Sequence, residues 1–160
     1  MNEDFEQLVQ RLNDAREAIT DLLPQAEKFK DKQICPGWTL KHMLAHMTGW
    51  DDAIIESLRA FMADKEPAVP ASKGINEYNS RTVYTRETLD YDRVRKEWEK
   101  TRHHLIDLLH QLPDEKITRS FTLPWGRVGK ISYLVKLFAE HEEEHAAEIR
   151  DWLTNPDHHK

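Results

Sequence analysis

The chain opens with a stretch in which apolar residues recur every three or four positions, the spacing of one face of an α-helix. This pattern predicts an amphipathic helix over residues 5–23, and Pro24 is expected to end or kink it. The stripe consists of Phe5, Leu8, Leu12, Ala15, Ile19 and Leu22.

The same periodicity predicts two more long helices. One begins near Thr39, a suitable N-cap, and continues through Trp50 to Phe61, before the loop-forming segment 67–74. After a short helix at 76–88, Asp90 opens the next long helix, which Pro113 stops.

Residues 113–127 lack helical periodicity and form a connection whose length favours a functional loop over a simple turn. Apolar positions from Ile131 to Trp152 then predict a last helix, which ends before Asn155. Four long amphipathic helices predict an all-α fold, most simply a four-helix bundle formed by one domain over residues 1–153. Residues 154–160 are expected to form a polar tail in which His158 and His159 are solvated.

Composition narrows the classes of function. Among 160 residues there are only 5 Gly and 7 Pro, which favours helix. The net charge of −6 comes without any long basic run, so we expect no binding to nucleic acid. No apolar stretch is long enough for a membrane span and the N-terminus is acidic, so a cytoplasmic location is expected. The single cysteine, Cys35, precedes a Pro-Gly turn and is expected to be an inert thiol.

Two histidines, His141 and His145, are spaced four residues apart within the apolar stripe of the last helix. With about 3.6 residues per turn, both imidazoles lie on one face and can bind one ion. A third histidine from the second helix, His46 or His42, would complete a three-nitrogen site of the catalytic type. By spacing alone, core histidines without a metal remain the alternative. Glu144 and Glu148, one turn along, either support the site from behind or belong to a solvated acidic face.

Two motifs resemble those of the DinB-like superfamily, also known as YfiT-like metal-dependent hydrolases. They are Pro36-Gly37-Trp38-Thr39-Leu40 leading into Leu44-Ala45-His46-Met47-Thr48-Gly49-Trp50-Asp51, and His141-Glu-Glu-Glu-His145-Ala-Ala-Glu-Ile. The resemblance implies an up-down-down-up topology with a long crossover between helices two and three, and a homodimer. It also implies that His46, His141 and His145 bind a divalent metal, zinc or nickel, with His42 left as an alternative ligand.

The resemblance further implies a small-molecule substrate. Enzymes of the superfamily include transferases and isomerases that use low-molecular-weight thiols such as bacillithiol or mycothiol, and hydrolase-like resistance proteins. Residues expected to contact substrate are Trp50, Asn76, Asn79, Arg81 and Trp125. Asn76 has an equal claim as a helix N-cap, and Trp125 as an anchor of its loop.

The favoured hypothesis is therefore a metal-dependent enzyme that activates a thiol or a water. No catalytic base is identified from the sequence, although Asp51, Asp52, Glu142 and Glu144 are possible by position. The alternatives are a noncatalytic metal-binding or small-molecule-binding stress-response protein and a metal-free bundle with structural histidines.

Overall fold

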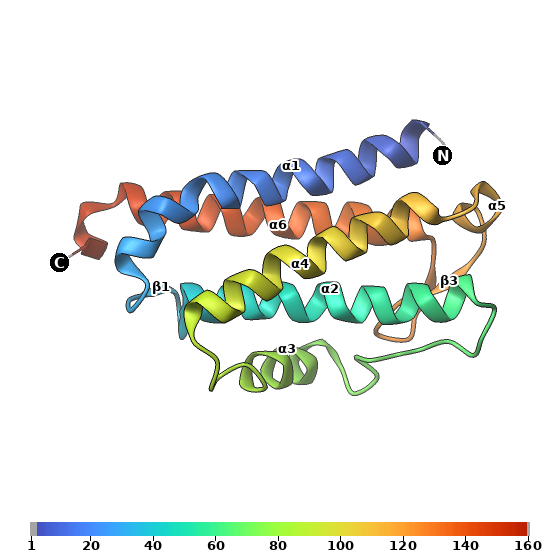
Figure 1. The fold of residues 1–160 in the computed structure, drawn as a ribbon, viewed down its shortest axis with the longest axis horizontal. Helices are drawn as coiled ribbons and strands as arrows, with labels where there is room; N and C mark the ends of the chain where they lie inside the picture. Colours follow the sequence, from blue (N-terminus) through green and yellow to red (C-terminus); the bar gives the residue numbers. More distant parts are fainter. Residues whose placement is uncertain (1–2, 160) are drawn as a thin grey trace. The chain divides into compact units, whose positions relative to one another are not determined.

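The structure, a computed structural model, describes residues 3–159 and is mostly helical. Figure 1 shows the helices, of which α1, α2, α4 and α6 are long. In chain order the elements are α1 Glu3–Ala26, η1 Glu27–Phe29, β1 Gln33–Cys35, β2 Trp38–Thr39, α2 Leu40–Met62, α3 Ile75–Tyr84, α4 Tyr91–Gln111, α5 Asp114–Ile117, β3 Phe121–Thr122, β4 Val128–Gly129, α6 Ile131–Thr154 and η2 Pro156–His159.

One compact unit comprises residues 3–41 and 135–159, in which α1 lies beside α6 (Figure 1). Its core is apolar, but the two helices also share a buried ion pair. The Arg16 guanidinium donates to both carboxylate oxygens of Glu142, at 2.8 and 3.3 Å, and the two residues are only 6% and 2% exposed. Arg11 makes a matching but exposed pair with Glu143. These contacts hold the histidine-bearing helix against α1.

The other compact unit comprises residues 42–134. Here α2 binds α4 through a second buried ion pair, in which Arg102 donates to both carboxylate oxygens of Asp51 at 2.9 and 3.0 Å. The short α3 packs on α2, where the Tyr78 hydroxyl donates to the Gly49 carbonyl at 2.6 Å. The segment between α2 and α4 is the long predicted crossover, and α3 lies within it.

Several helix boundaries agree with the sequence, and two do not. The short helix predicted at 76–88 ends at Tyr84, because residues 85–88 form turns. The Asp90 side chain accepts a hydrogen bond from the Arg93 amide, so it is the N-cap of α4 as predicted. The prediction that Pro24 ends the first helix is wrong by two residues, because α1 continues to Ala26, and the alternative of a kink at Pro24 stays a prediction. A proline in the last turn removes only one helical hydrogen bond, which is tolerable there.

The connection expected to lack regular structure contains a helical turn, α5, and the antiparallel hairpin β3–β4. Its strands have two residues each, too short for an alternating pattern to be visible in the sequence. The Gly126 backbone has a φ of 101°, a left-handed conformation that a glycine adopts without strain.

The C-terminal residues also differ from the expectation. Residues 156–159 form the short helix η2. The His158 ring stacks on Trp152 at a centroid distance of 5.3 Å, and the His159 ring stacks on Phe29 at 4.4 Å. His158 is nevertheless exposed, as expected, whereas the expectation of a solvated ring is wrong for His159, which is half-buried because it packs between the rings of Phe29 and Trp152.

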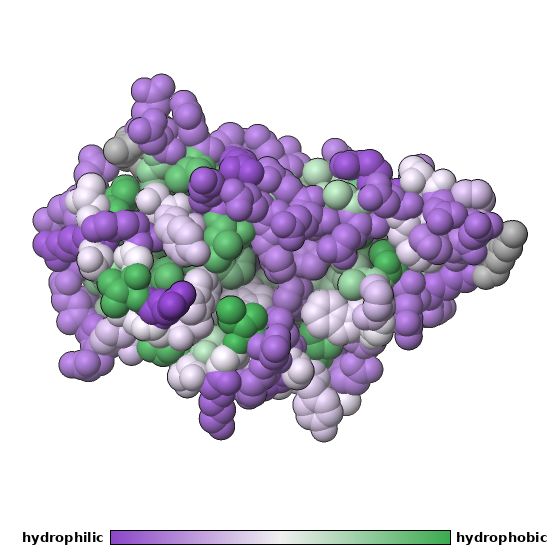
Figure 2. Space-filling model, turned by 180° about the vertical axis from the view of Figure 1, so that it is seen from behind, coloured by the Kyte–Doolittle hydropathy of each residue, from purple (hydrophilic) through white to green (hydrophobic). Residues whose placement is uncertain are grey.

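Polar and charged side chains cover most of the face in Figure 2, and hydrophobic residues surface in small groups. Four large hydrophobic residues are exposed within the described chain: Ile75, Tyr84, Val128 and Tyr133. Within residues 3–159, no helix combines the length and hydropathy that a membrane span requires.

Candidate metal centre

Helix α6 brings two imidazoles together. The Nε2 atoms of His141 and His145 lie 3.1 Å apart, as the spacing of four residues predicts. His145 is 7% exposed, and the Phe138 ring packs edge-on against His141 at a centroid distance of 6.0 Å. The two Nε2 atoms thus point at the same place, and Phe138 is an apolar neighbour of the pair.

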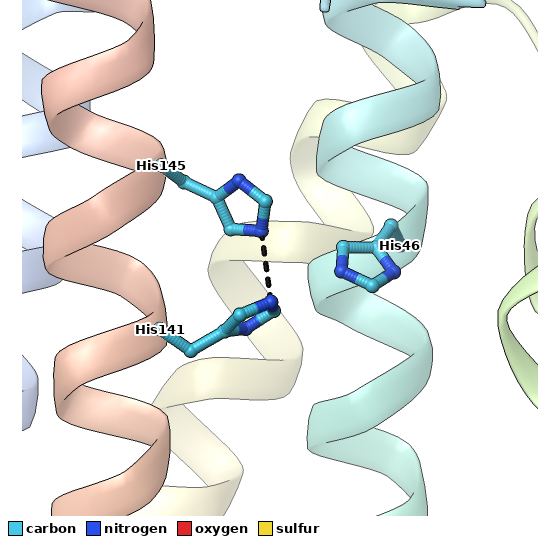
Figure 3. Close-up of side chains that lie close together, drawn as sticks. All are labelled: His46, His141 and His145. Atoms are coloured by element: carbon cyan, nitrogen blue, oxygen red, sulfur yellow. Dashed lines mark hydrogen bonds between the residues drawn. The ribbon is translucent and has the colours of Figure 1, made fainter. Parts of the chain in front are cut away.

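His46, on α2, is the third member of the cluster. Each of the three histidines offers a ring nitrogen, and these nitrogens all lie within 4.8 Å of one another (Figure 3). His46 is 4% exposed. His42, the alternative third ligand, instead places its Nε2 3.0 Å from a carboxylate oxygen of Glu87. Among the described residues, His46, His141 and His145 form the group of histidine, cysteine or acidic side chains suited to hold an ion.

Burial keeps the α6 imidazoles neutral. It lowers the pKa of both His141 and His145. At His141 the nearby His145 is a second cause of the lowered pKa. The acidic side chains of Glu142 and Glu144 act in the opposite direction but do not prevail. A neutral imidazole has the free lone pair that a metal ligand needs.

The donor set fits a divalent ion. Zinc binds histidine nitrogens at about 2.0–2.1 Å, so two nitrogens on one tetrahedral ion are roughly 3.3 Å apart. The observed 3.1 Å between the Nε2 atoms of His141 and His145 is close to that value. The three-histidine cluster is therefore compatible with a metal, although the geometry does not identify which one.

Glu148 lies behind His145. Its Oε1 is 3.8 Å from the His145 Nδ1, while the Nε2 of the same ring faces His141. The distance is too long for a hydrogen bond, so the carboxylate acts on the ring through its charge, which favours a proton on Nδ1 and leaves Nε2 as the ligand atom. Glu144, the other acidic residue expected there, is exposed, as is Glu148, and its charge also acts on both imidazoles.

Most carboxylates considered as catalytic bases have arginine partners. Glu142 binds Arg16 and Asp51 binds Arg102, both in buried pairs. Asp52 binds Arg86 at 2.8 Å, and burial still raises its pKa. These ion pairs give Glu142, Asp51 and Asp52 a structural role in the fold.

The Cys35 thiol shares Glu148 with His145. Burial raises the pKa of Cys35, and the charge and hydrogen bond of Glu148 raise it further. The prediction of an inert thiol agrees with this direction. The link between Cys35 and Glu148 was missed, because no sequence pattern connects a turn residue to one side of a distant helix.

Two of the residues expected to contact substrate are bonded to each other. The Trp50 indole donates to the Asn79 side-chain carbonyl at 2.6 Å, and its ring packs on Tyr78 at a centroid distance of 4.7 Å. Trp125, from the β3–β4 turn, meets Trp50 edge-on at 6.2 Å. Trp50 is 4% exposed, so within this unit it joins α3 and the hairpin to α2.

The other two residues are more exposed. Asn76 lies in the first turn of α3, but Gly74 is the N-cap, so the alternative role of Asn76 as an N-cap is wrong. Arg81 donates to the Glu77 carboxylate and to the Pro70 carbonyl, and its guanidinium lies over the Tyr78 ring. The role of these residues in substrate binding stays a prediction.

Comparison with known families matches residues 5–142 to the mycothiol maleylpyruvate isomerase N-terminal domain. The chain belongs to this family. The matched range includes His46 and His141 and ends three residues before His145. A search among curated proteins found no match.

Solved structures place the family in the wider DinB/YfiT fold. The mycothiol-dependent maleylpyruvate isomerase superposes with a TM-score of 0.69 at 19% identity, over 93% of this chain and 63% of that one. YfiT from Bacillus subtilis, described as a probable metal-dependent hydrolase with an unusual four-helix bundle topology, gives 0.67 at 17% identity, over 94% and 87%. The colibactin self-resistance protein ClbS, solved in complex with a double-stranded DNA, gives 0.75 at 10% identity, over 94% and 95%.

These matches confirm the predicted all-α four-helix bundle and the superfamily that the two motifs resemble. At identities of 10–19%, the solved structures by themselves establish only the fold. The chain spans only 63% of the length of the isomerase, so part of that enzyme has no counterpart in these 160 residues.

Proposed function

We propose that the protein is a divalent-metal-dependent enzyme whose metal is held by His46, His141 and His145. The observation that carries the proposal is the buried cluster itself, with three ring nitrogens within 4.8 Å of one another. The lowered pKa values of His141 and His145 favour the neutral, ligating form of both rings near neutral pH.

A metal held by three histidines acts as a Lewis acid toward a thiol or a water in its remaining coordination positions. The protein contributes neutral ligands, a carboxylate behind His145 and the Phe138 ring beside His141. Zinc and nickel both suit imidazole ligands.

We favour a low-molecular-weight thiol as the activated group, in an S-transferase or isomerase type of reaction. The family name refers to a mycothiol-dependent enzyme, which supports a thiol cosubstrate. The arginine partners of Glu142 and Asp51 also support it, since a thiol with a depressed pKa needs less help from a protein base than water does. Hydrolysis is the second form of the proposal, supported by the description of YfiT as a probable hydrolase.

The first experiment measures the metal content of untagged protein purified without chelator. We expect near-stoichiometric metal in the wild type and its loss in the His145→Ala variant. His103→Ala, which changes an exposed histidine on α4, is the matched control and should retain the metal. If the wild type neither contains metal nor binds added zinc or nickel, the proposal is wrong and the histidines are structural.

A second experiment separates the two reactions. The metal-loaded protein is incubated with electrophilic substrates in the presence or absence of mycothiol or bacillithiol. Consumption of thiol that requires His145 supports transfer, whereas product formation without thiol supports hydrolysis.

A noncatalytic metal-binding or small-molecule-binding role in a stress response is the competing proposal. It predicts retained metal without turnover in either assay. The homodimer and the cytoplasmic location stay predictions.

A further inference from the structure

A stretch of positive charge interrupts this acidic chain. Residues 116–139 contain no Asp or Glu, although the net charge of the whole chain is −6. The cations of the stretch are Lys116, Arg119, Arg127, Lys130 and Lys136. The β3–β4 hairpin lies inside it, so this part of the fold attracts anions more strongly than the rest.

Most of these cations have partners. Lys116 is 5% exposed and donates to the Phe61 carbonyl and the Asp64 carboxylate. Lys130 donates to the Thr118 carbonyl, and Arg119 lies 3.7 Å from Glu115. Arg127 and Lys136 are both exposed, and neither has a hydrogen-bonded side-chain partner or an ion pair among residues 3–159, but only Arg127 lines a hollow. Its charge is therefore available to a ligand.

A hollow of about 440 Å³ lies beside Arg127. Its walls are Leu123, Trp125, Arg127, Val128, Gly129 and Tyr133. This volume falls within the usual range for small-molecule sites, roughly 300–1,000 Å³. The hairpin that forms it is closed by a hydrogen bond from the Leu123 amide to the Arg127 carbonyl at 2.8 Å, and a second bond of 2.8 Å joins the Gly126 amide to the Leu123 carbonyl.

The walls combine apolar surface with the one cation. Val128 is 70% exposed and Tyr133 is 53% exposed, and Trp125 adds a half-buried indole. A flat apolar ligand can pack against the aromatic and aliphatic walls. The guanidinium can donate two parallel hydrogen bonds to a carboxylate.

We propose that this hollow binds a small carboxylate with a flat apolar body. Arg127 binds the carboxylate, and Trp125 and Tyr133 pack against the body. The proposal does not depend on the metal, because every residue of the hollow belongs to the unit of residues 42–134 and none is a histidine. A nucleic acid would use the same cations, but the net charge of −6 opposes a polyanion more than a single carboxylate.

The test is titration of the full chain with benzoate, followed by NMR shifts of the hairpin amides. Benzamide, which has the same ring without the charge, is the ligand control. We expect benzoate to saturate the hairpin signals, and Arg127→Gln to weaken its binding by at least about tenfold, the worth of one charge-assisted contact. Tyr133→Ala should weaken benzoate and benzamide alike.

The matched control is Arg119→Gln, which removes an exposed cation of the same stretch that does not line the hollow. This variant should bind benzoate like the wild type, and so should His145→Ala, which empties the proposed metal site. Equal loss in Arg119→Gln and Arg127→Gln would mean a diffuse charge effect and would overturn the proposal. Failure of benzoate to saturate below about 10 mM, a free energy near 3 kcal/mol, would also overturn it. Tighter binding of a DNA duplex at the same residues would assign the surface to nucleic acid instead.

Discussion

Gly49 on α2 lies so close to Thr82 on α3 that a Cβ built on Gly49 would stand 2.6 Å from the Cβ of Thr82. This close approach lets the Tyr78 hydroxyl reach the Gly49 carbonyl. Replacement of Gly49 by alanine should therefore push α3 off α2 and lower the free energy of unfolding by about 1 to 3 kcal/mol, measured by urea denaturation.

A double-mutant cycle tests the cause of that loss. In a Thr82→Gly background the three atoms nearest to the added methyl group are absent, so Gly49→Ala should cost less there than in the wild type. An equal cost in both backgrounds would show that the effect comes from the α2 backbone alone.

The Asp51–Arg102 pair predicts an asymmetry between single and double substitutions. Arg102→Met should lower the free energy of unfolding by about 3 to 5 kcal/mol, because Asp51 is 1% exposed and loses its ion-pair partner. Asp51→Leu combined with Arg102→Met should recover most of that loss. The exposed pair Arg95 and Glu99 is the control, and Arg95→Met should change stability by only about 0.5 kcal/mol. A double variant no more stable than Arg102→Met would contradict the prediction.

Tyr78 predicts a loss of stability in alkaline solution. Burial, followed by the charge of Asp52, raises the pKa of Tyr78 to about 12 from 10.0. Below pH 10 the phenol is protonated in both the folded and the unfolded state, so its contribution is fully present. Between pH 10 and about 12 only the unfolded state releases the proton, so roughly 2 to 3 kcal/mol of stability is lost across that window.

The measurement is the free energy of unfolding as a function of pH for the wild type and Tyr78→Phe. The variant lacks the hydroxyl and should show a shallower decline above pH 10. Parallel curves would assign the decline to other groups.

If the proposed metal is present, Glu148→Gln should weaken its binding by up to roughly tenfold, because the negative charge behind His145 increases the basicity of the ring. Competition with a chromogenic chelator measures the affinity. Asp151→Asn, an exposed change on the same helix whose charge does not act on either imidazole, should have little effect. Similar losses in both variants would indicate a general effect of negative charge.

Cys35 should react slowly with iodoacetamide. Its raised pKa leaves less thiolate at a given pH than an ordinary cysteine with a pKa of 9.0. Glu148→Gln should speed alkylation, since it removes the negative charge that disfavours the thiolate, whereas burial continues to slow it. The pH dependence of the alkylation rate separates these two causes, and a rate equal to that of the unfolded chain would contradict the prediction.

The long helices could be predicted from the sequence because each carries an apolar stripe over many turns. Helix boundaries that depend on one side chain, such as the N-cap of α4 at Asp90, could also be predicted from the sequence. The β3–β4 hairpin and the stacking of His159 on Phe29 were not, because strands of two residues leave no periodic signal and the ring contact joins residues far apart in the chain.

For the candidate site, helical spacing alone placed His141 beside His145. The choice of His46 over His42 came from the family resemblance, and the cluster geometry is consistent with it. The hydrogen bond between Trp50 and Asn79 could not be anticipated, since it depends on how α3 packs against α2.

The buried Arg16–Glu142 pair has one more consequence, for the axial alignment of α1 and α6. Apolar stripes tolerate sliding, because one methyl group can replace another as a neighbour. An ion pair in which a guanidinium binds both oxygens of one carboxylate does not tolerate such sliding. A shift of one helical turn, about 5.4 Å, would separate two buried charges at a cost of several kcal/mol. The pair thus fixes the axial position of α6 relative to α1, and with it the positions of His141 and His145 along the helix axis.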